Sequence, residues 1–284
     1  MNDRGVTQLD ELVAQGVRLP RLGLGTFRME GAICRAAVES ALGLGYRHID
    51  TAEMYGNEDA IGDALAASAV KRSDIHLTTK VWHSNLAPDA IRRSFDASLA
   101  KLKTDYIDLY LVHWPARDMD LARVLETLMA LKAEGRTRGI GVSNFPLALL
   151  RQAVEEIAAP IVCNQIEYHV LLDQTVLRRY AAERGIIITA FCPLARGHFA
   201  EYPALVGIAD KHGATPAQVA LAWLLDQDGV AAIPKASQVA NQKSNLESLN
   251  LRLDDSDRAA IAALPKDRRL VNPPTAPKWD KVCI

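Results

Sequence analysis

The amino-acid sequence predicts an α/β protein folded as a (β/α)8 TIM barrel, with an extra C-terminal helix and an irregular tail. Three observations lead to this fold. Eight short apolar runs alternate with segments of helical spacing along the chain. The runs are almost continuously apolar, as is typical of parallel strands buried on both faces. A chain of 284 residues suits two ordinary domains or one barrel, and no linker divides it.

The predicted strands are short and rich in β-branched residues, and each is bounded by glycine or polar residues. They cover residues 21–27, 46–52, 74–82, 106–114, 137–144, 161–168, 185–193 and 229–236.

The predicted helices lie between these strands and are rich in Ala, Leu, Arg and Glu. They cover residues 31–43, 58–69, 88–102, 120–134, 146–157, 173–184, 215–227 and 239–248. Pro88, Pro146 and Pro216 stand where the first turn of a helix tolerates proline.

An additional helix is predicted over residues 254–264, where aspartates open the segment, and a proline-bearing tail follows it. We expect one domain over residues 1–284, with a barrel core over about 21–250 and the helix and tail over 251–284. The tail has little regular structure of its own and is expected to lie over the barrel.

Composition favours a protein that acts on small molecules. The net charge is -1, which gives no bulk attraction to nucleic acid or to an anionic membrane. The start of the chain is polar, and no apolar run approaches the roughly eighteen residues of a spanning helix, so a cytoplasmic location is expected. Cys34, Cys163, Cys192 and Cys283 form no CxxC pair, and no HExxH is present, so we expect neither a disulfide framework nor a metal site.

Polar residues end three consecutive predicted strands. These residues are Asp50, Lys80 and His113, and Tyr55 follows Asp50 in a glycine-flanked loop. Taken singly, each has an ordinary explanation: a helix-capping aspartate, a snorkelling lysine, a core histidine, a tyrosine covering a loop. Because barrel chemistry collects where strands end, and a charged lysine there needs a partner, we expect all four at one site. Side chains at equal height on adjacent strands are expected to touch.

The segments GYRHIDTAEMYGNE, TTKVW, LYLVHWP, GVSNF, NQIEYH and IPKAS resemble those of the aldo-keto reductase family in order and spacing. The resemblance runs from about Leu22 to Leu264, and it is closest to the bacterial 2,5-diketo-D-gluconate reductases of the B type, which also reduce methylglyoxal. It implies the same barrel and an enzyme that reduces aldehydes and ketones to alcohols.

The resemblance also implies catalytic roles. Tyr55 matches the acid that gives a proton to the carbonyl oxygen, and Lys80 matches the cation that makes this easier. Asp50 keeps Lys80 charged and fixed. His113 matches the residue that donates a hydrogen bond to the substrate carbonyl.

Cofactor contacts are likewise implied by the resemblance, because the strings GLGTFR and GIGVSN lack the third glycine of a GxGxxG motif and are interpreted as barrel packing. Ser143, Asn144 and Gln165 match the residues that bind the nicotinamide carboxamide. Phe191 stands where most relatives stack a tyrosine on the ring, and Cys192 replaces a common serine and is interpreted as a small buried residue. The implied contacts are Gly25, Thr26, Asp50, Ser143, Asn144, Gln165, Phe191, Cys192, Leu194, Lys235, Ser237, Asn241 and Asn245.

The preferred cofactor is expected to be NADPH, with NADH as a weaker alternative. Lys235 and Ser237 match positions that hold the 2'-phosphate, whereas Asn241 stands where many relatives carry an arginine. Asn245 matches the residue that contacts adenine. The preference for NADPH is therefore expected to be weaker than in arginine-bearing relatives.

The substrate pocket is expected to be lined by Phe27, Trp82, His113 and Trp114. The connection after His113 is short, which favours an open site for small or sugar-like dicarbonyls, and a monomer is expected. Three alternatives remain open: an aldehyde reductase of broad specificity or alcohol-oxidising dehydrogenase on the same scaffold, a Schiff-base aldolase using Lys80, and a regulatory homologue without turnover.

Overall fold

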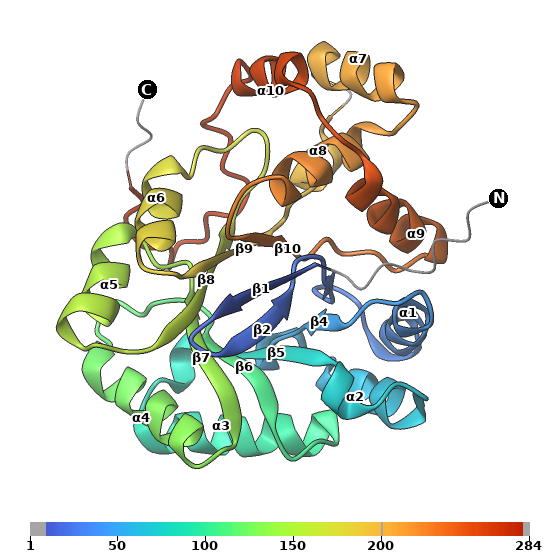
Figure 1. Cartoon of the computed structure of the whole chain (residues 1–284). Helices are drawn as coiled ribbons and strands as arrows, with labels where there is room; N and C mark the ends of the chain where they lie inside the picture. Colours follow the sequence, from blue (N-terminus) through green and yellow to red (C-terminus); the bar gives the residue numbers. More distant parts are fainter. Residues whose placement is uncertain (1–9, 200, 281–284) are drawn as a thin grey trace.

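Eight parallel strands form one sheet whose neighbours follow the order of the chain (Figure 1). The computed structural model describes residues 10–199 and 201–280. The strands are β3 (Leu24–Gly25), β4 (His48–Asp50), β5 (His76–Val81), β6 (Ile107–Val112), β7 (Thr137–Ser143), β8 (Ile161–Glu167), β9 (Ile187–Phe191) and β10 (Val230–Ala232). The first and last strands also meet, because Gly23 N donates to Ala232 O at 2.9 Å and Gly25 N to Pro234 O at 3.2 Å. The predicted barrel is therefore confirmed.

The predicted helices are all present outside the sheet. They are α1 (Gly31–Gly43), α2 (Glu58–Ala67), α3 (Pro88–Leu102), α4 (Leu121–Ala133), α5 (Leu147–Arg151), α6 (Thr175–Glu183), α8 (Pro216–Leu225), α9 (Val239–Glu247) and α10 (Asp255–Ala262). Thr215 and Asp254 each form a capping box that satisfies amides in the first turn of α8 and α10. Pro146 is the N-cap of α5 and not its first residue, and the helix continues as a π-turn over Gln152–Glu156.

Within residues 10–199 and 201–280, a β-hairpin and a helix are present that were not predicted. A hairpin of β1 (Glu11–Ala14) and β2 (Val17–Pro20) crosses the barrel in Figure 1, and its Leu19 packs with Leu109 and Leu111 of β6. It covers one end of the barrel interior. Helix α7 (Pro203–His212) lies beside α8 and α10, outside the ring of helices.

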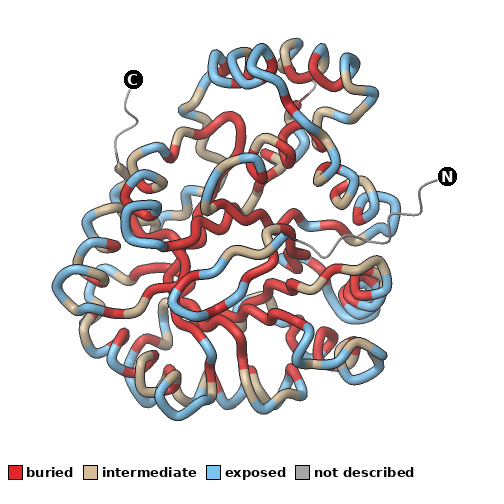
Figure 2. The backbone as a smooth tube through the Cα atoms, in the orientation of Figure 1, coloured by how far each residue is buried: buried red, intermediate tan, exposed pale blue. Residues whose placement is uncertain are grey.

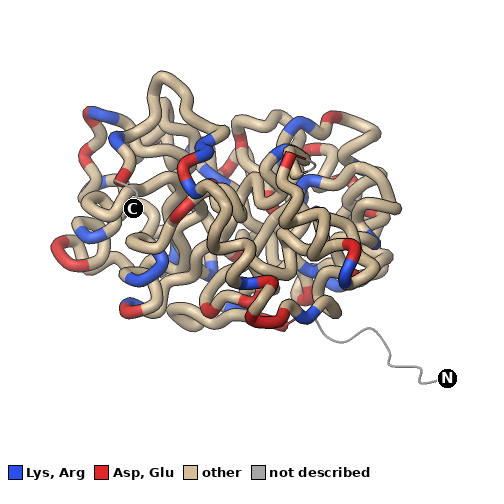
Figure 3. Tube along the Cα trace, turned by 90° about the horizontal axis from the view of Figure 1, so that it is seen from above, with Lys and Arg blue, Asp and Glu red and all other residues tan. Residues whose placement is uncertain are grey.

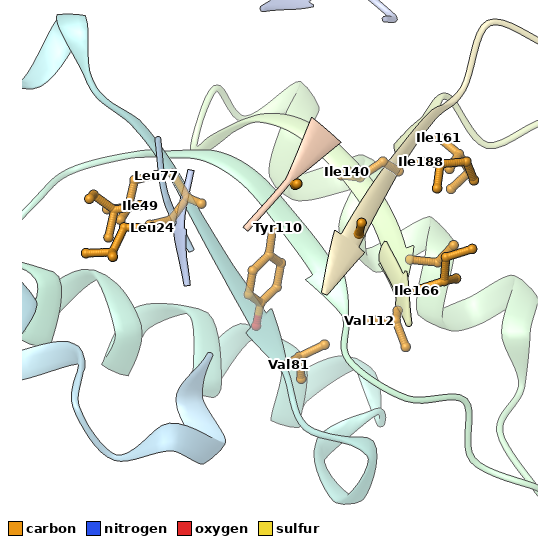
Figure 4. Close-up of a cluster of buried hydrophobic side chains, with 14 of the residues drawn as sticks. Leu24, Ile49, Leu77, Val81, Tyr110, Val112, Ile140, Ile161, Ile166 and Ile188 are labelled. Atoms are coloured by element: carbon orange, nitrogen blue, oxygen red, sulfur yellow. The ribbon is translucent and has the colours of Figure 1, made fainter. Parts of the chain in front are cut away.

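The core follows the strands, which are drawn almost wholly as buried in Figure 2. Leu24, Ile49 and Leu77 are register partners on adjacent strands and gather together in Figure 4. Charged residues of both signs are interspersed along the chain in Figure 3. Within the described ranges, no helix is long and apolar enough to span a membrane, and no group of three or more His, Cys, Asp or Glu could hold a metal ion.

Candidate active site

Lys80 on β5 is the centre of a buried polar cluster. Its ammonium group donates to Asp50 Oδ1 at 2.6 Å, to the carbonyl oxygen of Thr51 at 2.7 Å and to the Tyr55 hydroxyl at 3.4 Å. The side chains of Lys80 and Asp50 are 0% and 1% exposed. An ammonium group has three donors, so each donor of Lys80 has one partner.

The strands bring Asp50 and Lys80 together although the two are not register partners. Asp50 is the register partner of Thr78, two residues before Lys80. Because barrel strands tilt by about 36° to the axis, residues at one height are not register partners. The long lysine side chain reaches back to Asp50 across this offset.

Burial and charge act against each other in the cluster. Burial acts to lower the pKa of Lys80, but the charge of Asp50 and the hydrogen bonds outweigh it, and the net pKa is raised. Withdrawal from water raises the pKa of the Tyr55 phenol, and the charge of Lys80 opposes that rise. At neutral pH the cluster therefore holds a charged lysine beside a protonated phenol.

His113 follows β6 and lies against the phenol. Its ring centroid is 5.6 Å from that of Tyr55 and 5.1 Å from that of Trp82. Burial, with the charges of Lys80 and His83 acting the same way, holds the His113 pKa well below its usual range, so the ring is neutral. A neutral imidazole keeps one N–H donor for a nearby oxygen.

Ser143, Asn144 and Gln165 form a continuous polar shelf beside this cluster. Ser143 donates to Gln165 O at 2.8 Å, and Asn144 Nδ2 donates to His113 O at 3.0 Å. Gln165 Nε2 donates to Asp50 Oδ2 at 2.7 Å. Asn144 Oδ1 is buried and has no partner among the described residues. The shelf thus presents an unused acceptor beside the Lys80 cluster.

Contacts between neighbouring strands position Gly25, Thr26 and Phe191. A Cβ on Gly25 would lie 2.5 Å from the carbonyl oxygen of Ile233, so close packing there requires glycine. The Thr26 hydroxyl donates to Asp50 O at 2.9 Å. Phe191 pairs in register with Glu167 and is half-buried.

Cys192 and Leu194 continue from β9 and are also half-buried. Burial, together with the charge of Glu167, raises the pKa of the Cys192 thiol. The thiol is therefore protonated at neutral pH, and the residue is half-buried, whereas the sequence was interpreted as placing a small buried residue there.

The segment at the start of α9 combines exposed and buried residues. Lys235 and Asn241 are exposed, and Ser237 is half-buried. Asn245 is 5% exposed, and its Nδ2 atom has no partner in the part of the chain that the structure describes. A buried amide donor without a partner marks a place where a ligand acceptor fits.

Aromatic side chains form walls next to the cluster. Phe27 is 45% exposed, and its ring lies 5.0 Å from that of Tyr55. The Trp82 ring lies against that of His113, with centroids 5.1 Å apart. Trp114 packs against Trp279 of the tail, with ring centroids 6.1 Å apart. Trp279 was not predicted as a site residue, because its place after several prolines gives no signal for one.

The tail is anchored over the barrel as expected, by a residue that the sequence analysis also missed. The fully buried carboxylate of Glu167 accepts the backbone N–H groups of Leu270 at 2.6 Å and Val271 at 2.9 Å. At the other end of the tail, Asp280 accepts the N–H of Leu147 at 2.9 Å. These contacts bring Trp279 to Trp114.

Comparisons with known proteins agree with one another. The Aldo/keto reductase family model matches residues 21–266. Methylglyoxal reductase DkgB of Escherichia coli O157:H7 is 43% identical over 266 residues, covering 92% of this chain and 99% of that protein. A glyoxal reductase of Bacillus subtilis is 38% identical over 258 residues, covering 90% and 92%. A crystal structure provisionally described as a 2,5-diketo-D-gluconic acid reductase B matches with a TM-score of 0.93 and 40% identity, covering 96% and 98%.

Proposed function

Because this chain belongs to the aldo/keto reductase family, we propose that it reduces small dicarbonyl compounds to hydroxycarbonyl compounds with NADPH, and that Tyr55 donates the proton. The single observation that carries this proposal is the contact of Lys80 Nζ with both Asp50 Oδ1 and the Tyr55 hydroxyl. A fixed positive charge next to a protonated phenol lowers the cost of the tyrosinate that remains after proton transfer.

The cofactor residues support a nicotinamide dinucleotide. A reduced nicotinamide, when bound, supplies the hydride for the carbonyl carbon. Asn144 Oδ1 and Asn245 Nδ2 are the unpartnered buried atoms expected to meet its carboxamide and its adenine. Lys235 and Ser237 are the residues we assign to the 2'-phosphate, which is the basis for preferring NADPH over NADH.

The positions of the remaining residues support the following roles. His113, held neutral, orients the carbonyl by donating from its ring nitrogen and stabilises the charge that develops on the oxygen. Asp50 keeps Lys80 charged. Phe27, Trp82 and Trp114 exclude water and hold the substrate by shape, and we add Trp279 to this wall.

The proposed substrate class is supported by the relatives and by the aromatic side chains beside the Lys80 cluster. The relatives are named for methylglyoxal, glyoxal and diketogluconate reduction. A Schiff-base aldolase would require an uncharged lysine at this strand end, and the raised pKa of Lys80 argues against it. Action as a monomer in the cytoplasm stays a prediction.

The test is an assay of the purified protein with methylglyoxal and NADPH, following absorbance of the reduced cofactor. Consumption of NADPH that depends on methylglyoxal and yields hydroxyacetone or lactaldehyde is expected. If NADPH binds but is not oxidised in the presence of methylglyoxal, glyoxal or diketogluconate, the protein is a regulatory homologue without turnover.

A further inference from the structure

Glu53 makes a contact that the proposed mechanism does not use. It begins the 3-10 turn η1 (Glu53–Tyr55), which carries the proposed proton donor. Its Oε1 atom accepts the backbone N–H of Trp82, and it accepts Asn85 Nδ2 at 3.1 Å. Trp82 directly follows β5, the strand that carries Lys80. One carboxylate oxygen therefore joins the Tyr55 turn to the segment after the Lys80 strand.

The two ends of the Tyr55 loop are held by other bonds. Thr51 donates from its hydroxyl to Asn57 Oδ1 at 2.8 Å, and Asn57 Nδ2 donates to Thr26 O and Met29 O at 2.9 Å each. These bonds fix the start and the end of the loop. Within the described residues, the side chains of the turn itself are held by hydrogen bonds of Glu53 and by the 3.4 Å contact of Tyr55 with Lys80.

We propose that Glu53 is a positioning residue that holds Tyr55 within reach of Lys80 and holds Trp82 against His113. This inference rests on the proposed function, in which the Tyr55 hydroxyl gives up its proton beside Lys80. The Tyr55 contact is the longest of the three that Lys80 makes, so a small shift of the turn breaks it before the others. The same shift releases the Trp82 amide and the wall that it supports.

Glu53 acts through geometry and not through its charge. The charges that act on the Tyr55 phenol and change its pKa are those of Lys80 and Asp50. Both bonds of Glu53 end on the same oxygen, Oε1. A glutamine keeps an acceptor oxygen at that place and loses the charge, whereas an alanine loses both. The pair of substitutions therefore separates positioning from electrostatics.

The experiment compares Glu53→Ala and Glu53→Gln with the parent protein, and it uses Glu30→Ala as a matched carboxylate control. Glu30 is exposed at the start of α1 and makes no capping bond. We measure kcat and KM for methylglyoxal, Kd for NADPH, and hydrogen exchange of the Trp82 amide. Glu53→Ala is expected to lower kcat by about 10- to 100-fold, as misplacement of a reacting group does.

Two further measurements on Glu53→Ala show whether the substitution disturbs only the Tyr55 turn or also the cofactor site. NADPH binding is expected to be unchanged, and exchange of the Trp82 amide is expected to be faster. Glu53→Gln is expected to restore most of the turnover and the slow exchange, and Glu30→Ala is expected to match the parent. Parent-like kcat in Glu53→Ala, or equal losses in the alanine and glutamine variants, would overturn the proposal. If the alanine variant does not fold, Glu53→Asp, whose side chain is one methylene shorter, is expected to show the same loss of turnover and the same faster exchange.

Amide exchange keeps this inference separate from the proposed function. If the parent protein does not reduce dicarbonyls, the proposed function is wrong, but the Trp82 amide still reports on the contact with Glu53. Exchange that is equally slow in the parent and in Glu53→Ala would then overturn the positioning role by itself. Faster exchange together with a loss of turnover supports both.

Discussion

The side-chain amide of Gln165 donates a 2.7 Å hydrogen bond to Asp50 Oδ2, the carboxylate oxygen that Lys80 does not bind. One oxygen of Asp50 therefore binds the Lys80 cluster, and the other binds the polar shelf that we assign to the nicotinamide. A residue assigned to the cofactor and a residue assigned to catalysis are one hydrogen bond apart. Changes on either side of this bond are expected to affect both functions.

Gln165→Met tests that link, because methionine has a similar volume and no amide donor. It leaves Asp50 Oδ2 buried with one partner fewer, which is expected to lower the free energy of unfolding by about 1 to 3 kcal/mol. Turnover is expected to fall, and NADPH binding to weaken. Urea unfolding of the protein without cofactor and steady-state kinetics check these expectations. An unchanged unfolding free energy would mean that the bond contributes little.

Lys80→Met removes the cation and leaves the Asp50 carboxylate buried. Breaking a buried pair in this way is expected to cost about 3 to 5 kcal/mol of unfolding free energy, and turnover at neutral pH is expected to be lost. The double variant Lys80→Met with Asp50→Asn is expected to recover stability but not activity. A single variant with normal activity at neutral pH would contradict the assigned pairing.

His48 and His76 make the stability of the protein depend on pH. The two rings meet edge to face with centroids 4.9 Å apart, and both are buried below the hairpin. Burial, together with the charge of His76, lowers the pKa of His48 to about 3; burial, with the charges of Arg72 and Arg138, lowers that of His76 to about 3. The charges of Asp50 and Lys80 also act on His48, in opposite directions.

In the unfolded chain a histidine binds its proton near pH 6.5, so the unfolded state binds more protons than the native state between about pH 6.5 and 3. The unfolding free energy is therefore expected to fall as pH falls through this window, by up to about 1.4 kcal/mol per pH unit for each histidine. Urea titrations at several pH values compare the pH slope of the parent protein with that of His76→Gln. His198→Gln, at a partly exposed histidine near the surface, is the control. The same pH slope in the parent protein and in His76→Gln would exclude this origin.

The barrel and the strand ends could be predicted because local patterns encode them. A parallel strand buried on both faces leaves a continuous apolar run, and Asp50, Lys80 and His113 stand out where such runs end. The hairpin over Glu11–Pro20 could not be predicted in the same way. Its strands have four residues each and include Glu11 and Arg18, and their stability depends on the barrel end that they cover.

Helix α7 could not be predicted either, because it lies in a stretch with Gly207 and neighbouring glycines, where helical spacing is weak.

The contacts that organise the site are not encoded in local patterns. The Gln165–Asp50 bond joins residues 115 positions apart, and the Glu53–Trp82 bond joins residues 29 positions apart. Such contacts depend on strand stagger and on loop conformation, which emerge only in the folded barrel.

Asn241→Arg tests whether the segment at the start of α9 binds the 2'-phosphate of NADPH. Asn241 is exposed on α9, and Lys235 is exposed just before that helix. An arginine is expected to tighten NADPH binding by about 1 to 3 kcal/mol and to change NADH binding much less, because NADH has no 2'-phosphate. Lys235→Ala is expected to reduce the preference for NADPH over NADH by a similar amount. Fluorescence titrations that give equal shifts for both cofactors would show that this segment does not read the phosphate.

The most direct test of the central claim is the kcat of Tyr55→Phe for methylglyoxal reduction, measured together with its Kd for NADPH. Phenylalanine keeps the ring beside Phe27 and His113 and removes only the hydroxyl that meets Lys80. If Tyr55 donates the proton, kcat falls by about 10²- to 10⁴-fold while NADPH binding is unchanged. A variant that keeps more than about a tenth of the parent kcat would contradict the assignment of Tyr55 as the acid.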